Sequence, residues 1–452
     1  MAALPKEVQY NKPMASLPAE TSSMNVNVRP SNGAVFTRAG GDIIQFDLPA
    51  HSFLVPSSLT LRGSIKLTPT DGATDLINVA GIPGASWIQR VETIVGGSLL
   101  ESVNDYGRLY NLLGQVNIDY ATKAGLQTEF ALGGGGTNGQ SAKNPSFHTL
   151  NGRDGPKFSG GSAAEAGSYK FAIPLGCLLS SCSELIPLGH MGGVRIQLTT
   201  DQVANFIYNA STENDKTVPD IEYSQLELNF DLVDFGGAMD GVVRSMANAD
   251  GDLILKTQGW NVSNVALPVQ TANAQNEFVY NVRLSSIKSL ILQGTGTAKN
   301  ECLNGLYDAV QVAGTTGSTQ FFIANKAYPQ TPLREDNVAS VMSALRQAMG
   351  QAHDIYHSNI AIPVKQFTEI ASLGTVTASS NFEPASHFVG MNTEKLSTNS
   401  VMMSGESSQL TPINVRLNPS NATDATATLT LFANYDALIG INVASRQIQV
   451  RV

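Results

Sequence analysis

The sequence predicts an all-β protein with two β-rich halves, long loops and a few short helices. Three observations lead to this prediction. Apolar residues alternate with polar ones along many strand-sized runs, the runs form two blocks of similar length, and a stretch rich in glycine and aspartate separates the blocks. Alternation with a period of two is typical of antiparallel strands that bury one face. The chain has 452 residues, which is enough for two or three domains.

The first block holds four runs in which apolar side chains alternate with polar ones. Their apolar positions are Ile44, Phe46 and Leu48, then Leu59, Leu61, Ile65 and Leu67, then Val194, Ile196 and Leu198, and finally Leu226, Leu228, Phe230 and Leu232. After Val233 the sequence DFGGAMDGVVRSMANADGD shows no sustained alternation, so we place a domain boundary near residue 240.

The second block restarts the alternation and ends inside a predicted strand. Its apolar positions are Phe278, Tyr280, Val282 and Leu284, then Ile413, Val415 and Leu417, then Ala427, Leu429 and Leu431, and finally Ile448, Val450 and Val452. Because both blocks close on an alternating strand, we interpret them as one architecture used twice, at residues 30–240 and 241–452. Residues 1–29 contain three prolines and little periodicity, so we expect an N-terminal arm that becomes ordered against a partner.

Two stretches have the spacing of helices. In the first, the apolar positions are Val103, Tyr106, Tyr110, Leu113 and Val116. The second is predicted to begin at Thr331 and Pro332, an N-cap and first-turn pair, with Glu335 and Asp336 favouring the positive end of the helix. Its apolar stripe is Val338, Met342, Leu345 and Met349, before Gly350.

The chain has unusually few charges. Lys and Arg total 28 and Asp and Glu total 37, a net charge of −9, yet charged residues make up only 14% of the chain against about 25% in an average globular protein. The net negative charge argues against a protein whose entire surface binds nucleic acid. The basic residues are scattered singly, so specific nucleic-acid recognition is not indicated. A weak contact of the arm with nucleic acid through Lys6, Lys12 and Arg29 stays open. The alternative, an arm that is simply exposed to solvent, stays open as well.

Cysteine usage and hydropathy place the chain among soluble proteins made in a reducing compartment. The three cysteines are Cys177, Cys182 and Cys302, an odd number without a CxxC pair, so neither a disulfide framework nor a structural zinc site is expected. Lys6 and Glu7 interrupt the place of a signal peptide core. No segment approaches the ~18 apolar residues of a membrane span.

Several motifs come close to a catalytic or binding site and fall short. Gly133–Gly136 lead into TNGQ rather than into a Lys and a hydroxyl residue that would hold phosphates. His353 and His357 have the i, i+4 spacing of a metal site, but a third ligand is missing. The string GGSLL at Gly96–Leu100 lacks the second glycine of a serine nucleophile elbow.

The remaining candidates favour structural roles. Cys177 and Cys182 lie in the apolar context FAIPLGCLLSSC and are interpreted as buried structural thiols. Glu335 and Asp336 are interpreted as helix-end charges rather than as a general acid and base. We therefore assign no catalytic, cofactor-binding or metal-ligating residue, expect no cofactor, and predict that the chain is not an enzyme.

Four segments together resemble the double jelly-roll major capsid proteins of Polinton-like viruses, virophages and adintoviruses, and more distantly those of tailless icosahedral phages and adenovirus-like viruses. The segments are DIIQFDLPAHSFLVPSSLTLRGSIKL (42–67), SWIQRVETIVGGSLLESVNDYGRLYNLL (86–113), YKFAIPLGCLLSSCSELIPLGHMGGVRIQLTT (169–200) and SQLELNFDLVDF (224–235). The likeness lies in pattern and order, runs over residues 30–452, and is weaker in the second half. The family has no catalytic motif, so no site residue is carried over.

The resemblance implies two consecutive eight-stranded antiparallel jelly rolls. It further implies a trimer with a pseudo-hexameric outline, an icosahedral shell that encloses the genome of a DNA virus, and a location in the virion after assembly inside the host cell. The implied partners are further copies of the chain, penton proteins, and minor capsid or cement proteins, with the arm on the inner face of the shell.

Two other classes of function stay open at this stage. The first is a carbohydrate-binding jelly-roll protein, such as a lectin or a receptor-binding spike, although Trp87 and Trp260 lie beside predicted strands rather than in long loops. The second is a glycoside hydrolase with two carboxylates, which the lack of a cluster rich in Trp and Glu makes the weakest of the three.

Overall fold

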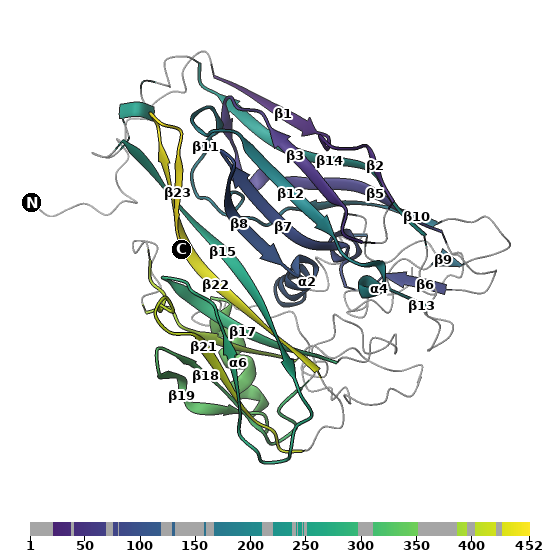
Figure 1. Cartoon of the computed structure of the whole chain (residues 1–452), viewed down its shortest axis with the longest axis vertical. Coiled ribbons are helices and arrows are strands. Elements are labelled where there is room, and N and C mark those ends of the chain that lie inside the picture. The colour runs from purple at the N-terminus through teal and green to yellow at the C-terminus, as the bar shows by residue number, and fades with distance from the viewer. Residues whose placement is uncertain are drawn as a thin grey trace, which may run out of the picture.

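The protein consists of two β-sandwich units, seen one above the other in Figure 1. We call the unit from β1 (Ser22–Val28) to β14 (Asp220–Asp234) the first roll, and the unit from β15 (Asp252–Leu267) to β23 (Ile448–Arg451) the second roll. The computed structural model describes residues 21–37, 40–68, 76–79, 81–118, 129–131, 158–159, 167–209, 220–236, 241, 243–245, 247, 251–296, 311–350, 387–395, 403–421 and 427–452.

The first roll is built from two main antiparallel sheets. One sheet joins β10 (Gly167–Pro174), β5 (Thr60–Thr68), β14 and β1, with the short strands β2 (Val35–Phe36), β4 (Phe53–Leu54) and β11 (Ile186–Pro187). The other has the order β3 (Ile43–Leu48), β12 (Val194–Thr200), β7 (Ile88–Val95) and β8 (Ser98–Asn104). A smaller sheet contains β13 (Ile207–Asn209), β6 (Leu76–Val79) and β9 (Phe158–Ser159).

The second roll repeats this plan of two main antiparallel sheets. One has the order β15, β22 (Ala427–Asn442), β17 (Ile287–Gly296) and β20 (Phe388–Asn392), with β23 also paired to β22. The other has the order β16 (Asn276–Tyr280), β21 (Ile413–Asn418), β18 (Ser318–Ile323) and β19 (Lys326–Arg334). Each roll thus uses two sheets with four principal strands apiece, and the all-β prediction is confirmed.

The alternation of apolar and polar residues determines which face of each strand is buried. In the β3–β12 pair, Phe46 lies opposite Ile196, and both side chains are fully buried. One residue along, Gln45 lies opposite Gln197 on the other face, where the Gln45 amide donates to Gln197 Oε1 at 3.2 Å. A one-residue slip would reverse these faces, so the hydrophobic pattern specifies the register.

The first predicted helix begins later than its spacing suggested. It forms α2 (Tyr106–Asn117), whereas Val103 lies in β8. Asp105, with φ 47°, turns the chain between the two elements. Val103 and Tyr106 are both buried, so their spacing imitates a helical repeat although Val103 belongs to the strand.

The start predicted for the second helix is wrong. The helix is α6 (Val338–Ala348), and its N-cap is Asn337, whose side chain accepts a hydrogen bond from Ser340 N at 3.2 Å. Thr331 and Pro332 lie in β19 instead. β19 is at the edge of its sheet among the described strands, and its register with β18 is interrupted between Tyr328 and Leu333. Pro332 lies in this irregular stretch of an edge strand, where a proline is tolerated.

Short helical turns connect the strands. They are η2 (Pro56–Ser58), α1 (Pro83–Ser86), η4 (Leu188–His190) and α4 (Val203–Phe206). No helix in the described part of the chain is long and apolar enough to cross a membrane.

The described part of the expected arm lies in a sheet. Residues 22–28 form β1, which pairs with β14 from Ser22 opposite Asp234 to Val28 opposite Leu228. Just beyond it, Arg29 Nε lies 3.2 Å from Glu227 Oε1. Lys6 and Lys12 lie outside the described residues.

Candidate functional site

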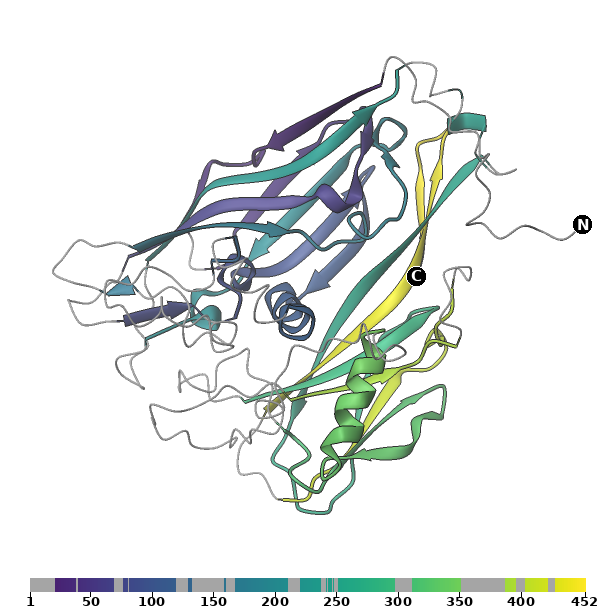
Figure 2. The same ribbon diagram turned by 180° about the vertical axis from the view of Figure 1, so that it is seen from behind.

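The two rolls meet along a surface that we call the seam. On the first roll it consists of β8, α2 and the loop of residues 176–182, and on the second roll it consists of β15 and β22. Thr257 of β15 donates its hydroxyl proton to the carbonyl of Leu178 at 2.5 Å. Arg108 of α2 donates to the hydroxyl of Thr430 at 3.4 Å. Figure 2 shows the long β15–β22 pair running beside the first roll.

Gly259 permits the close approach of the rolls. A Cβ atom at this position would lie 2.7 Å from the Tyr435 ring and 3.0 Å from a methyl group of Leu178. Since real Cβ contacts are longer, a side chain here would push the loop away from β15. A glycine in the interior of a strand commonly marks such an approach.

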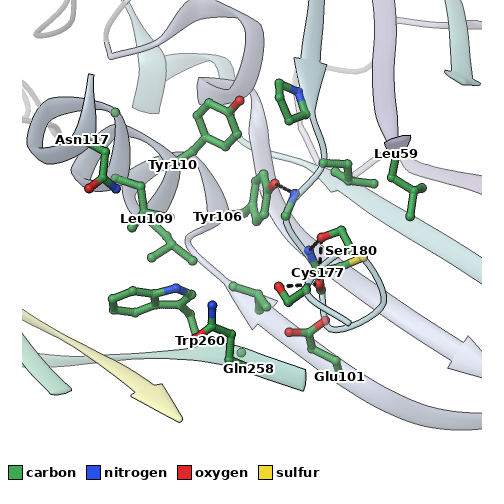
Figure 3. Close-up of a pocket in the computed structure, with 18 of the residues that line it drawn as sticks. Leu59, Glu101, Tyr106, Leu109, Tyr110, Asn117, Cys177, Ser180, Gln258 and Trp260 are labelled. Carbon is green, nitrogen blue, oxygen red and sulfur yellow. Dashed lines mark hydrogen bonds between the residues drawn. The ribbon is translucent and has the colours of Figure 1, made fainter. Parts of the chain in front are cut away.

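A cavity of about 400 Å³ opens at the seam. Its size falls in the range of small-molecule sites, roughly 300–1,000 Å³. Figure 3 shows Tyr106, Leu109 and Tyr110 of α2 together with Trp260 and Gln258 of β15 around this space. We call it the seam pocket. Further residues that line it are Leu59, Val103, Leu113, Asn117, Phe130, Leu175, Cys177 and Ser180.

Glu101 supplies an acidic group to the otherwise uncharged lining of the seam pocket. Glu101 is only 6% exposed, and the N–H of Leu178 donates to Oε2 of its carboxyl at 2.7 Å. Burial raises the pKa of Glu101 to about 7, against the lowering effect of that hydrogen bond. Among the described residues, no Lys, Arg or His lines the pocket, and no second hydrogen bond reaches the carboxyl.

Aromatic rings form the wall beside this acid. The rings of Tyr106 and Tyr110 are 5.9 Å apart, and those of Tyr110 and Phe130 are 6.0 Å apart. The Tyr106 hydroxyl accepts a hydrogen bond from Gly176 N at 2.8 Å. Burial raises the pKa of Tyr106 well above its usual value, and the charge of Glu101 contributes in the same direction. Tyr106 therefore holds the loop and lies within the electrostatic reach of Glu101.

The interpretation of Cys177 and Cys182 as buried thiols is confirmed. Both are buried and unpaired. Burial raises the pKa of Cys177 to about 11 and that of Cys182 to about 12, so both remain protonated and unreactive at neutral pH. Cys302 lies outside the described residues.

The interpretation of Glu335 as a helix-end charge is wrong. Its side chain is buried, and its Oε2 lies 2.9 Å from Nε2 of His387. Gln311 donates to the same oxygen at 3.3 Å, and Thr319 donates to Oε1 at 3.4 Å. Glu335 thus connects the sheet to the segment before β20. Asp336, by contrast, is partly exposed and pairs with Arg334 at 2.6 Å.

The other sequence candidates that lie among the described residues are not assembled into a site. Gly96 and Gly97 of the GGSLL string form the turn between β7 and β8, with φ values of 56° and 81°. In the described part of the chain, no three His, Cys, Asp or Glu residues are arranged to hold a metal ion. Gly133–Gly136, His353 and His357 lie outside that part.

The seam pocket was not predicted from the sequence. Glu101 and Leu178 are 77 residues apart, and β15 comes from the other half of the chain. The only local signal was a single acidic residue in the strand run SLLESV, which is also typical of a solvated strand face.

Comparison with solved structures identifies the fold. No family model matches the sequence, and no curated protein matches it. The Faustovirus major capsid protein superimposes with a TM-score of 0.59 at 10% identity, over 96% of this chain and 92% of that one. PBCV-1 VP54, fitted into a reconstruction of the virophage Sputnik, gives 0.58 at 9% identity over 98% and 99%. The mavirus major capsid protein gives 0.52 at 12% identity over 100% and 95%.

The chain has the double jelly-roll fold of these proteins. The sequence resemblance to double jelly-roll capsid proteins is thereby confirmed at the level of fold. The match covers almost the full length of both partners in each comparison, so both rolls and their order are shared. The seam pocket lies between the two rolls of this double jelly-roll chain.

Proposed function

We propose that the chain is the major capsid protein of a virus. Three copies would form a trimeric, pseudo-hexameric capsomer, and capsomers would tile an icosahedral shell that encloses the genome. The observation that carries this proposal is the double jelly-roll fold itself, matched to capsid proteins of several viruses over nearly the whole chain. Such a protein acts in the virion by assembly and not by catalysis.

The arrangement of two rolls in one chain supports this geometry. A closed threefold ring of such chains places six rolls around the axis, which gives an approximately hexagonal outline. The low fraction of charged residues, 14%, is in keeping with a surface that becomes buried against other copies, because interface cores are depleted in Lys, Glu and Asp. Penton and minor capsid or cement proteins, and a weak contact of the arm with nucleic acid, belong to the same proposal.

The carbohydrate-binding alternative receives no support from the two tryptophans. Trp87 is fully buried, and its Nε1 donates to Gly84 O at 2.8 Å. Trp260 lines the seam pocket. Neither presents an open aromatic platform to a glycan on a loop.

Light scattering coupled to size exclusion tests the trimer. Three copies of the 47.8 kDa chain should give a particle of about 143 kDa. A chain that remains at 47.8 kDa when concentrated would contradict the proposed capsomer.

A further inference from the structure

The seam pocket has a composition that the capsid role does not require. A contact between two rolls is stabilised most simply by close apolar packing, and a buried acid at such a place is costly unless it is paired. Here the cavity of about 400 Å³ remains open beside Glu101. Only one hydrogen bond, from Leu178 N, reaches this carboxyl among the described residues.

The negative charge in the pocket favours a positively charged ligand. Glu101 is the ionisable carboxyl in the lining, and the described lining residues include no cation to balance it. At pH 8, above the pKa of about 7, the carboxyl is ionised and its Oε1 is available as an acceptor. A carboxylate or phosphate ligand would be repelled, whereas an ammonium group would supply both the missing donor and the opposite charge.

The aromatic and apolar walls of the pocket favour a ligand with an apolar body. Tyr106, Tyr110, Phe130 and Trp260 contribute aromatic rings to the lining. A cation is attracted to the faces of such rings, most strongly where it is removed from water. Beyond the rings, Leu109 and Leu113 offer an apolar surface along α2 that suits an alkyl or aryl body.

We propose that the seam pocket binds a small organic cation, an amine carried on an apolar alkyl or aryl body. The ammonium group donates to Oε1 of Glu101 beside the ring of Tyr106, and the body lies between α2 of the first roll and Trp260 of the second. Because such a ligand contacts both rolls, it stabilises the seam by mass action. This inference does not depend on the capsid role.

Three probes that share one body separate charge from hydrophobicity. They are phenylbutylamine, phenylbutanol and phenylbutanoate, each titrated calorimetrically into the purified full-length protein at pH 8. We expect the amine to bind at least tenfold more tightly than the alcohol, and the carboxylate to bind more weakly than both. The amine should also raise the thermal midpoint of the protein.

Glu101→Gln is the decisive variant, because it keeps the size of the side chain and removes its charge. It should leave the affinity for the alcohol unchanged and bring the affinity for the amine down to that of the alcohol. Glu184→Gln removes an exposed carboxyl just beyond the loop and should leave the preference for the amine intact. Trp260→Leu should weaken both the amine and the alcohol.

Three results would overturn the proposal. The first is equal binding of the amine and the alcohol to the unaltered protein. The second is a preference for the amine that survives in Glu101→Gln, since the cation would then be bound elsewhere. The third is the absence of any binding by the three probes.

Discussion

A buried carboxyl and a buried hydroxyl hold the loop of residues 176–182 in place. Leu178 N–H donates to Glu101, and Gly176 N–H donates to Tyr106. Both acceptors belong to buried residues of the first roll, while the carbonyl of Leu178 accepts from Thr257 of the second roll. The backbone of the loop is therefore hydrogen-bonded to both rolls, and these bonds fix the position of one roll relative to the other.

Glu101 makes the stability of the protein depend on pH. Its pKa is about 7 in the folded chain against 4.5 as the ordinary value. As the pH rises from 4.5 to 7, the unfolded chain loses this proton first, so the group lowers the free energy of unfolding progressively across that window. At about 1.4 kcal/mol per pKa unit, the loss is about 3 kcal/mol.

Glu101→Gln should remove this dependence. Relative to the unaltered protein, the variant should gain about 3 kcal/mol in free energy of unfolding between pH 4 and pH 8. Urea denaturation of both proteins at equal chain concentration measures the difference. If the variant and the unaltered protein differ by the same free energy of unfolding at both pH values, burial does not shift the pKa of Glu101.

Tyr106→Phe should destabilise the protein by about 1 to 3 kcal/mol, because it leaves the N–H of Gly176 without its acceptor. Tyr110→Phe is the matched control, since its hydroxyl takes part in no described hydrogen bond. Urea denaturation should place Tyr106→Phe clearly below the control. Equal losses would mean that the hydrogen bond to the loop contributes little.

At the scale of elements, the strands were predictable where one face is buried and the other is exposed to solvent. The burial of β12 follows the alternation of Val194, Ile196 and Leu198 that the sequence displays. The helix starts were not predictable in this way. Thr331 and Pro332 carry the local signs of an N-cap, but β19 pairs with β18 on both sides of them, at Tyr328 and at Leu333, and this contact between distant segments keeps the stretch extended. Burial of Glu335 likewise depends on His387, 52 residues away.

The two candidate starts of α6 can be distinguished by substitution. Asn337→Ala should cost about 1 kcal/mol, because it removes the side chain that accepts from Ser340 N. Thr331→Ala, at the start predicted from sequence, changes an exposed strand residue and should cost less than about 0.5 kcal/mol. The midpoints of thermal unfolding provide the measurement. The reverse order would contradict the observed helix start.

At the scale of the whole molecule, the two β-rich halves were predictable because alternation of apolar and polar residues is a local pattern, whereas the double jelly roll was implied by the family resemblance. The seam could not be predicted from the sequence. The seam brings together Glu101, Leu178 and Trp260 from three distant segments, and their meeting is decided by how the rolls pack and by the space that Gly259 leaves. Only the folded chain reveals that an acid and an aromatic wall share one cavity.

The proposed capsomer requires three chains, and thus six rolls, around one threefold axis. Electron microscopy of the purified chain, followed by threefold averaging of single particles, tests it most directly. We expect particles with a hexagonal outline, six densities around the axis, and sheets of such particles at high concentration. Isolated two-lobed particles without threefold symmetry at every concentration would contradict it.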